Sequence, residues 1–238
     1  MSVFDLRRGQ SLLAVGAHPD DIELLCAGTL ARVKRDGARV SLCVICNGDK
    51  GQPKKPVADL GAVRHREMQT AARALGALLI WLDVPDGELF EDMPTRRLVI
   101  EAFRISRPDV VICHDPNDYH PDHQAASRLC QAASWFAPSP GHRTDSPPLA
   151  RSPRVFFMDT VTGLGFEPQL YVDVTATLQV KDRMLRCHVS QLGRGKQARF
   201  TNIMELMRDQ AKFRGHQCGA RHAEAFRPML QWKRVAAM

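Results

Sequence analysis

Short apolar runs alternate with segments of helical periodicity through the first half of the chain. Four runs have the length and apolar composition of buried strands: residues 11–16, 40–46, 77–82 and 109–113. Three segments between them repeat apolar residues at helical spacing and end beside a glycine or a proline: residues 22–36, 60–75 and 95–106. This alternation predicts a Rossmann-like, doubly wound α/β fold, in which helices cover both faces of a mainly parallel sheet.

The second half of the chain continues this pattern less regularly. Residues 137–153 are rich in proline, serine and glycine, which predicts a flexible surface loop. Around it we expect helices at 122–136, 175–191 and near 201–213, strands at 154–157 and 169–174, and a break at 193–195. Because 238 residues with 44% hydrophobic content suit one core, we expect a single domain over residues 1–238, completed by residues 154–238.

Composition argues against two classes of protein. No segment approaches the roughly 20 apolar residues of a membrane-spanning helix, and the N-terminus lacks the apolar stretch of a signal peptide, so we expect a cytoplasmic protein without a membrane span. The net charge of +7 is dispersed along the chain, and only two tyrosines and three tryptophans are available for base stacking. We therefore expect no nucleic-acid partner, but a basic surface or a modest preference for an acidic substrate.

The seven cysteines are an odd number without the spacing of a disulfide framework. Cys43 and Cys46 form a C-x-x-C pair, which is found in redox and zinc sites. Both lie in the apolar run 40–46, however, and no second pair with zinc-ribbon spacing exists. We therefore interpret them as buried thiols within a strand.

Clusters of histidine and aspartate follow two of the predicted strands. Residues 18–21 read His-Pro-Asp-Asp, and residues 120–123 read His-Pro-Asp-His. Either cluster alone is more typical of a helix cap or of solvated surface. Carboxyl ends of parallel strands meet at one edge of a sheet, where ligands of such folds bind, so we expect the two clusters to form one site.

The residue types in these clusters indicate a hydrolytic metal centre. His18 and Asp21 can converge on one ion, and His123 completes three protein ligands for Zn²⁺ with room left for water. Metal-bound water is acidified to a pKa of roughly 7. Asp20, beside the ligands without being one, is then placed to accept the proton of that water as a general base.

The second cluster supplies two further groups. His120 is three residues from His123 and can face the same cavity, where it would stabilise an oxyanion or protonate a departing amine. Asp122 can accept a hydrogen bond from one of these rings and fix its tautomer.

The chain resembles a known family, the LmbE-like or PIG-L-type metal-dependent de-N-acetylases. The resemblance runs in the family's order from residue 12 to about residue 226 and rests on these motifs: Gly16-Ala-His-Pro-Asp-Asp21, Gly28-Thr29, Arg64-x-x-Glu67, Pro85-Asp86-Gly87, Asn117-x-x-His120-Pro-Asp-His123, His188-x-Ser190-Gln191 and Ala223-Glu224-x-Phe226.

The resemblance implies a zinc-dependent hydrolase that removes an N-acetyl group, usually from an amino sugar or amino-sugar conjugate, and releases acetate. The implied roles are metal ligands at His18, Asp21 and His123, a general base at Asp20, and an oxyanion-stabilising or proton-donating His120 backed by Asp122. Arg64 matches a basic residue that faces the substrate. Fe²⁺ or Co²⁺ suits the same ligands, and the oligomeric state, including a homo-oligomer, is left open.

One position departs from the family pattern. Many relatives carry a tyrosine before Ala-Glu, where this chain has His222. An imidazole can also donate a hydrogen bond, so both a site role and a surface position stay open for His222. The alternative to an active enzyme is a catalytically inactive module of the same fold, which binds metal and a sugar without turnover.

Overall fold

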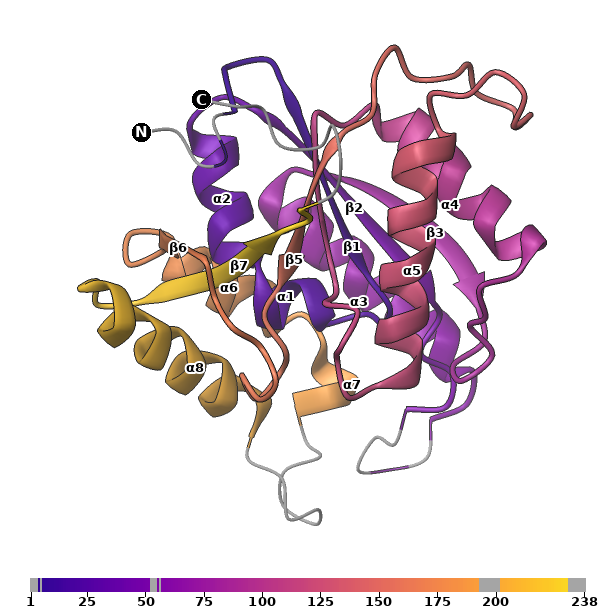
Figure 1. The fold of residues 1–238 in the computed structure, drawn as a ribbon. Coiled ribbons are helices and arrows are strands. Elements are labelled where there is room, and N and C mark those ends of the chain that lie inside the picture. The colour runs from indigo at the N-terminus through magenta and orange to yellow at the C-terminus, as the bar shows by residue number, and fades with distance from the viewer. Residues whose placement is uncertain (1–3, 5, 52–54, 56, 193–201, 231–238) are drawn as a thin grey trace.

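The computed structural model describes residue 4 and residues 6–51, 55, 57–192 and 202–230. Seven strands of these residues form one sheet in the order β3-β2-β1-β4-β5-β7-β6 (Figure 1). Along the chain they are β1 (Ser11–Gly16), β2 (Arg39–Cys46), β3 (Leu78–Val84), β4 (Val110–Cys113), β5 (Arg154–Met158), β6 (Leu170–Asp173) and β7 (Ala223–Pro228). Of the seven, β7 alone runs antiparallel to its neighbours β5 and β6, which confirms the predicted doubly wound, mainly parallel sheet.

Helices cover both faces of this sheet (Figure 1). In the described part of the chain they are α1 (Asp21–Leu25), α2 (Ala27–Arg35), α3 (Leu60–Leu75), α4 (Met93–Ser106), α5 (Pro121–Phe136), α6 (Leu178–Leu185), α7 (Val189–Leu192) and α8 (Ile203–Cys218). Buried side chains of α1, α2, α3, α6 and α8 pack on one face, and those of α4 and α5 pack on the other. None of these helices is long and apolar enough to cross a membrane.

Alternation along the buried strands explains the two packed layers. In β1, Leu12 and Ala14 belong to the core cluster on one face, while Leu13 and Val15 belong to the cluster on the other. The central strands carry apolar residues at consecutive positions because both of their faces are covered.

Local signals set the ends of the longer helices. The Asp59 side chain accepts a hydrogen bond from the backbone N–H of Ala62 at the start of α3, and Gly76, with φ 68°, ends that helix. Asp92 caps α4 in the same way through the N–H of Thr95. These caps explain why the predicted bounds of α3 agree with the structure, since each is a local interaction that the sequence displays.

The strand order puts the two His/Asp clusters side by side. β1 pairs in parallel with β2 on one side and with β4 on the other. The strand order therefore reverses direction between β1 and β4. Ligands of doubly wound sheets bind at such a switch point, beyond the carboxyl ends of the strands. Residues 18–21 follow β1 and residues 120–123 follow β4 after a loop, which brings the clusters to this crevice.

Two predicted helices differ from the structure, and one strand was not predicted. The single helix expected at 22–36 is wrong, because Cys26, with φ −142°, separates α1 from α2. The helix expected at 175–191 is divided into α6 and α7. No strand was expected at β7, whose position between β5 and β6 depends on distant pairing. The break expected at 193–195 lies outside the described residues.

The loop at 137–153 contains no helix or strand, and one arginine of α4 organises its first part. The buried Arg104 donates to the backbone oxygens of Ala137 and Ser139 and to the Thr144 hydroxyl. Leu149 is buried in the core cluster beneath α4 and α5. The segment is therefore attached to the domain at several points, and its flexibility stays a prediction.

A buried ion pair joins the C-terminal strand to the N-terminal half. The Glu224 carboxylate in β7 accepts hydrogen bonds from the backbone N–H groups of Gly28 (2.9 Å) and Thr29 (2.7 Å) and from the Lys181 ammonium of α6. We call Glu224, Lys181 and the two N–H groups the Glu224 lock. Because those N–H groups belong to the first turn of α2, the carboxylate also meets the positive end of the helix dipole.

Candidate metal centre

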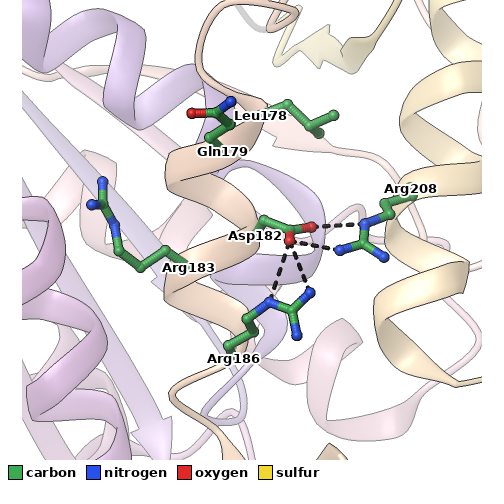
Figure 2. Close-up of a pocket in the computed structure, with 6 residues that line it drawn as sticks. All are labelled: Leu178, Gln179, Asp182, Arg183, Arg186 and Arg208. Carbon is green, nitrogen blue, oxygen red and sulfur yellow. Dashed lines mark hydrogen bonds and ion pairs between the residues drawn. The ribbon is translucent and has the colours of Figure 1, made fainter.

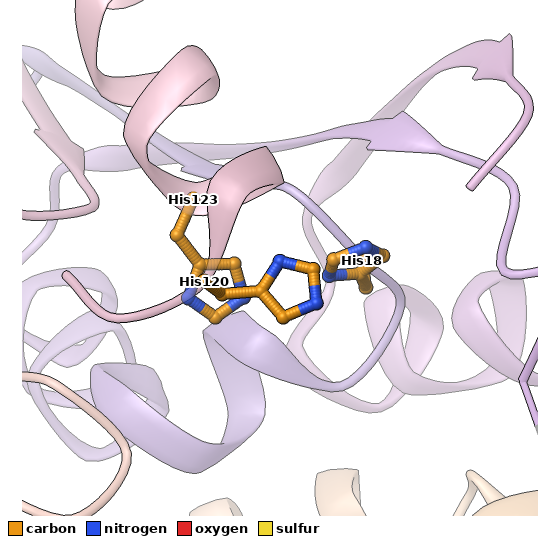
Figure 3. Close-up of side chains that lie close together, drawn as sticks. All are labelled: His18, His120 and His123. Carbon is orange, nitrogen blue, oxygen red and sulfur yellow. The ribbon is translucent and has the colours of Figure 1, made fainter. Parts of the chain in front are cut away.

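Three imidazoles meet at the switch point between β1 and β4. Figure 3 shows His18 from the β1 loop facing His120 and His123 from the start of α5. Ring centroids lie 4.9 Å apart for His18 and His120, 5.5 Å for His18 and His123, and 4.7 Å for His120 and His123. The predicted meeting of the two clusters is therefore seen in the structure.

The His-Pro-Asp-Asp segment forms a tight turn that leads into α1. The His18 N–H donates to Asp21 Oδ2 at 2.7 Å, and the Asp21 N–H donates back to the His18 carbonyl at 3.3 Å. Asp20, between them in the chain, has a φ of 104°, in the left-handed region that non-glycine residues rarely adopt. The turn thus directs the two adjacent aspartates differently.

Asp21 lies between the histidines and is almost completely buried. Its Oδ2 is 3.5 Å from His18 Nδ1, and its Oδ1 is 3.4 Å from His123 Nε2. The three predicted ligands thus lie together around one carboxylate. Among the described residues, three triads have donor atoms within 4.8 Å of one another, and each combines one or two of the predicted ligands with other residues. These triads are His18, His120 and His123; Asp21, His114 and His123; and His18, Cys46 and Asp86.

Two neighbours of His123 were not among the residues predicted for the site. His114, fully buried, stacks on the His123 ring with centroids 3.9 Å apart, and its Nε2 lies 3.1 Å from Asp21 Oδ2. Asp118 Oδ2 lies 3.1 Å from His123 Nδ1. The signal for both was their place directly after β4, within the same loop that supplies the predicted cluster.

Asp122 has a different partner from the one expected. Its Oδ2 accepts hydrogen bonds from His18 Nε2 at 3.0 Å and from the backbone N–H of Gly87 at 2.9 Å. The prediction that this carboxylate orients His120 or His123 is therefore wrong, because the first turn of α5 directs it toward the β1 loop. It orients His18 instead.

The backbone of α5 fixes the tautomer of His120. As the N-cap residue, its Nδ1 accepts a hydrogen bond from the Asp122 N–H at 3.2 Å. A neutral ring that accepts at Nδ1 carries its proton on Nε2. Burial and the neighbouring His123 and His18 lower the pKa of His120, which favours this neutral form.

Burial and charge shift the other pKa values in opposite directions. Burial disfavours the charged His18 ring, but Asp122 and Asp21 outweigh it and raise its pKa to about 10. Burial likewise opposes charge on His123, while Asp21 and Asp118 raise its pKa to about 9. Burial and the charge of His123 lower the pKa of His114 to about 4. The centre therefore holds charged and neutral imidazoles within van der Waals distance.

The two adjacent aspartates also differ in ionisation. Burial raises the pKa of Asp20 above its ordinary value, although Arg64 opposes this effect. Burial acts in the same sense on Asp21, but His123 and His114 outweigh it and hold that pKa well below its ordinary value. Asp21 is thus the firmly ionised member of the pair.

Arg64 lies beneath this turn, not at its rim. Only 3% of the residue is exposed, and its Nη2 contacts Asp20 Oδ2 at 3.3 Å. Its role toward a substrate, expected from the resemblance, stays a prediction.

His222 is half-buried just before β7, and its described hydrogen bonds are to Thr175 and Val174. Of the C-x-x-C pair, Cys43 and Cys46 are both buried free thiols as expected, and burial raises the pKa of Cys43 to about 12. Cys46 also belongs to one of the compact triads.

The donor set of the centre fits a divalent transition metal. Imidazole nitrogens and carboxylate oxygens are good ligands for Zn²⁺, Fe²⁺ and Co²⁺. Among the described groups, the buried His114 Nδ1 has no hydrogen-bond partner, which is costly unless the surroundings compensate. A buried cluster of this composition is typical of a metal site.

A cavity of about 380 Å³ lies between α6 and α8, away from the metal centre (Figure 2). Asp182 accepts hydrogen bonds from both Arg186 and Arg208, while Arg183 points away from it. The residues that line this cavity include three arginines and one aspartate but no histidine, so they do not resemble the donor set of the metal centre.

Comparisons with known proteins place the chain among relatives with the same motifs. The family described as PIG-L: GlcNAc-PI de-N-acetylase matches residues 13–134, which include both His/Asp clusters. The chain is 28% identical over 234 residues to diacetylchitobiose deacetylase from Thermococcus kodakarensis, covering 92% of this chain and 82% of that protein. It is also 24% identical over 192 residues to 4-oxalmesaconate hydratase from Pseudomonas putida, covering 76% and 74%.

A solved structure supports the same relationship. The conserved protein TT1542 from Thermus thermophilus has a TM-score of 0.77 and 32% identity, with 95% of this chain and 99% of that chain covered. The shared fold and the matched residues confirm the resemblance seen in the motifs. The chain therefore belongs to the PIG-L family of de-N-acetylases.

Proposed function

We propose that this protein is a metal-dependent hydrolase that removes the N-acetyl group from an N-acetylated amino sugar or amino-sugar conjugate and releases acetate. The observation that carries the proposal is the division between two adjacent aspartates at the centre: the Asp21 carboxylate contacts the histidines, while the Asp20 carboxylate contacts Arg64. The family and the diacetylchitobiose deacetylase relative support N-acetylglucosamine-type substrates.

We infer that His18, Asp21 and His123 hold the metal. They combine two nitrogens with one carboxylate, and Asp122 and Asp118 lie behind the two rings at hydrogen-bonding distance. A Zn²⁺ ion bound there would acidify a water molecule and polarise the acetamide carbonyl, and Fe²⁺ or Co²⁺ would serve the same chemistry.

Asp20 acts as the general base. Its carboxylate is not one of the three metal ligands, so it is available to accept a proton from water at the centre. Arg64 contacts it at 3.3 Å. His120 acts on the negative charge that develops on the carbonyl oxygen. Its Nε2–H is a donor placed near His18 and His123, where it would stabilise the developing oxyanion and then support release of the amine.

Tyr119 is a candidate contact for the sugar. Its side chain is exposed by 63% and lies edge-on to His120 and His123, with centroids 6.1 and 6.0 Å apart. An exposed aromatic ring beside a polar centre offers an apolar surface to the face of a sugar ring. Sequence reasoning did not single it out, because one tyrosine between polar residues is typical of a surface loop.

Two further properties follow as proposals. We infer that residues 1–238 form one domain, because β5, β6 and β7 complete the sheet begun by β1. We also expect the site to act on a small molecule, without nucleic acid as a partner.

Two other functions compete with this proposal. A catalytically inactive module would bind metal and sugar without turnover, but such a module needs neither a base nor an oxyanion donor. The hydratase relative raises a second reaction, the addition of water to a carbon–carbon double bond, for which a centre with a base and a metal is also suited. The reactions differ in their product, since only the hydrolase releases acetate.

The test is an acetate-release screen. Purified protein loaded with Zn²⁺ is incubated with N-acetylglucosamine, diacetylchitobiose and N-acetylglucosaminyl conjugates, with and without a chelator. We expect acetate and a free amine in equal amounts from at least one compound, and none after chelation. Metal binding without acetate from any compound would contradict the proposal, and water addition to 4-oxalmesaconate would favour the hydratase.

A further inference from the structure

We propose that Cys46, His18 and Asp86 form a second metal site, which takes a thiophilic divalent cation and overlaps the metal centre at His18. We call these three residues the thiol site. Occupation of the thiol site inhibits the proposed hydrolase, because the cation competes for His18 with the ion held by Asp21 and His123. This inhibition rests on the proposed function, whereas the binding of the cation does not.

Three neighbouring strands bring the thiol site together. β3, β2 and β1 are adjacent and parallel, so their carboxyl ends meet at one edge of the sheet. Asp86 follows β3, Cys46 is the last residue of β2, and His18 follows β1. The donor atoms of the three side chains all lie within 4.8 Å of one another. His123 comes from the opposite side of β1, after β4, so the two donor sets share only His18.

The His18 ring lies between the two donor sets. Its Nδ1 is 3.5 Å from Asp21 Oδ2, whereas its Nε2 is 3.0 Å from Asp122 Oδ2 and 4.0 Å from Asp86 Oδ1. A neutral imidazole offers one acceptor nitrogen, so it ligates one cation at a time. A cation drawn toward Asp86 therefore removes His18 from an ion at Asp21.

The donor types of the thiol site favour a soft cation. Thiolate sulfur is a preferred ligand of thiophilic metals such as Zn²⁺ and Cd²⁺, and one sulfur, one nitrogen and one oxygen leave room for water in a tetrahedral site. The thiolate and the Asp86 carboxylate carry two negative charges, which neutralise a divalent cation. The ligands inferred for the metal centre include one carboxylate and no sulfur, so the two sites differ in the cation that they prefer.

The backbone holds Cys46 beside the loop that carries His18. The Cys46 N–H donates to the Ala17 carbonyl at 2.7 Å. Cys46 is fully buried, while the side chains of His18 and Asp86 are 14% and 12% exposed. A cation can therefore enter past His18 and Asp86, and the thiol forms the buried end of the site.

Asp86 is positioned by its own turn and has lone pairs left for a cation. Its backbone N–H donates to Asp49 Oδ1 at 2.9 Å, and its Oδ1 accepts a hydrogen bond from the Gly48 N–H at 2.7 Å. Its Oδ2 lies 4.0 Å from Arg64 Nη1, which is beyond hydrogen-bonding distance. The carboxylate is thus fixed through one oxygen and available through the other.

Three costs oppose the binding of a cation at the thiol site. Burial, followed by the charges of Asp122 and Asp86, raises the pKa of the Cys46 thiol above its ordinary value. Binding must therefore replace the S–H bond by a sulfur–metal bond and release one proton to water. The cation also displaces the proton that His18 donates to Asp122, and the charge of Arg64 lies nearby. We therefore expect Zn²⁺ to fill the thiol site only after the metal centre.

A cadmium titration tests the thiol site without an assay of activity. The starting protein carries one equivalent of Zn²⁺ and the substitutions Cys187→Ser and Cys218→Ser, which remove the two cysteines that are not buried. Added Cd²⁺ should produce the ultraviolet charge-transfer band of a cadmium–thiolate bond, and Cys46→Ser should abolish it. No band in the starting protein, or an unchanged band in Cys46→Ser, would overturn the proposal.

Two further variants control this titration. Cys43→Ser should keep the band, because Cys43 is a buried thiol of the same strand but belongs to none of the compact triads in the described part of the chain. Asp86→Asn keeps the thiol and should lower the affinity for Cd²⁺. Loss of the band in Cys43→Ser, or an unchanged affinity in Asp86→Asn, would contradict the assigned ligands.

Excess zinc tests the inhibition. Acetate release by the wild type should fall about tenfold when free Zn²⁺ reaches roughly ten times the dissociation constant of the thiol site, measured by competition with Cd²⁺. Each variant is compared with its own activity at one equivalent of Zn²⁺. Over the same range Cys46→Ser should lose no more than about twofold, whereas Cys43→Ser should be inhibited like the wild type. Equal inhibition of Cys46→Ser and the wild type would contradict the proposal.

The cadmium titration and the acetate assay can fail separately. If the wild-type protein releases no acetate at any zinc concentration, the proposed function fails, and the cadmium–thiolate band alone decides whether the thiol site exists. If acetate is released but no band forms, the proposed function stands and the thiol site is refuted.

Discussion

Two buried charged clusters, the Glu224 lock and the metal centre, contrast within the same sheet. In the lock, each oxygen of the Glu224 carboxylate has a donor: the Gly28 N–H and the Lys181 ammonium on one, the Thr29 N–H on the other. At the centre, imidazoles contact one another, and His114 Nδ1 has no hydrogen-bond partner among the described groups. A carboxylate satisfied by its own chain is structural, whereas a cluster left incomplete is built for something it binds.

The contrast also explains why both clusters draw on residues far apart in sequence. Glu224 joins strand β7 to α2 and α6, and so closes the C-terminal part of the fold onto the N-terminal part. The centre also joins the ends of β1 and β4, through the His18–Asp122 hydrogen bond and the hydrogen bond from the Ala17 N–H to His114 Nε2, but it leaves His114 Nδ1 without a partner among the described groups. We therefore expect the lock to govern stability and the centre to govern activity.

Metal removal should have the largest effect and should act on one cluster only. Chelation is expected to lower acetate release by more than about 100-fold, because water activation depends on the bound ion. Circular dichroism should show an intact fold, since the lock contains no ligand. Recovery of activity on adding Zn²⁺ is the control. Loss of the fold on chelation would contradict the assignment of stability to the lock and of activity to the centre.

Substitution of the lock should give the opposite result. Glu224→Gln leaves Lys181 charged and buried, which we expect to lower the free energy of unfolding by about 3–5 kcal/mol. Acetate release per folded molecule should stay near that of the wild type. Urea unfolding measures the free energy of unfolding. The double variant Glu224→Leu with Lys181→Met should regain part of the lost stability.

A smaller effect is expected from crowding the lock. A Cβ at Gly28 would lie 2.8 Å from Val174 Cβ and 3.0 Å from Glu224 Oε1. Gly28→Ala should therefore cost about 1–3 kcal/mol of stability, as overpacking does. Gly141→Ala provides a comparison, since Gly141 has no positive φ and its added Cβ meets only Ser139 Oγ, at 3.8 Å. A stability change at Gly28 no larger than this control would argue against close packing at the lock.

The smallest effect should come from the rim of the centre. Tyr119→Ala is expected to raise KM by roughly tenfold, about 1.4 kcal/mol of binding, with kcat nearly unchanged. Tyr119→Phe should behave like the wild type if the ring face makes the contact. A loss of kcat in both variants would instead assign the hydroxyl to the reaction.

The sequence predicted what depends on pattern and on strand position. Buried strands such as β1 and β4 are recognisable as apolar runs in the sequence. Because parallel strands bring their carboxyl ends together, the proximity of His18 and His123 could be predicted. The contacts between individual side chains could not be predicted from the sequence. Asp122 contacts His18, and Arg64 lies buried under Asp20, because loop paths between distant segments decide these contacts.

The break at Cys26 and the strand β7 show the same limit. Residues 22–36 carry helical periodicity throughout, and nothing local marks the turn that separates α1 from α2. β7 contains Glu224, whose charge argues against a buried strand unless its contacts with Lys181 and α2 are known. Tertiary contacts overrode the local pattern in both places.

Asp20 and Asp21 offer the most direct test of the metal centre, because they are neighbours with different proposed roles. Zinc content and acetate release should be measured together in Asp20→Asn and Asp21→Asn. Asp20→Asn is expected to keep its zinc and lose turnover by a factor of about 10²–10⁴, whereas Asp21→Asn should lose the zinc itself. Full turnover in Asp20→Asn, or undiminished zinc in Asp21→Asn, would contradict the account.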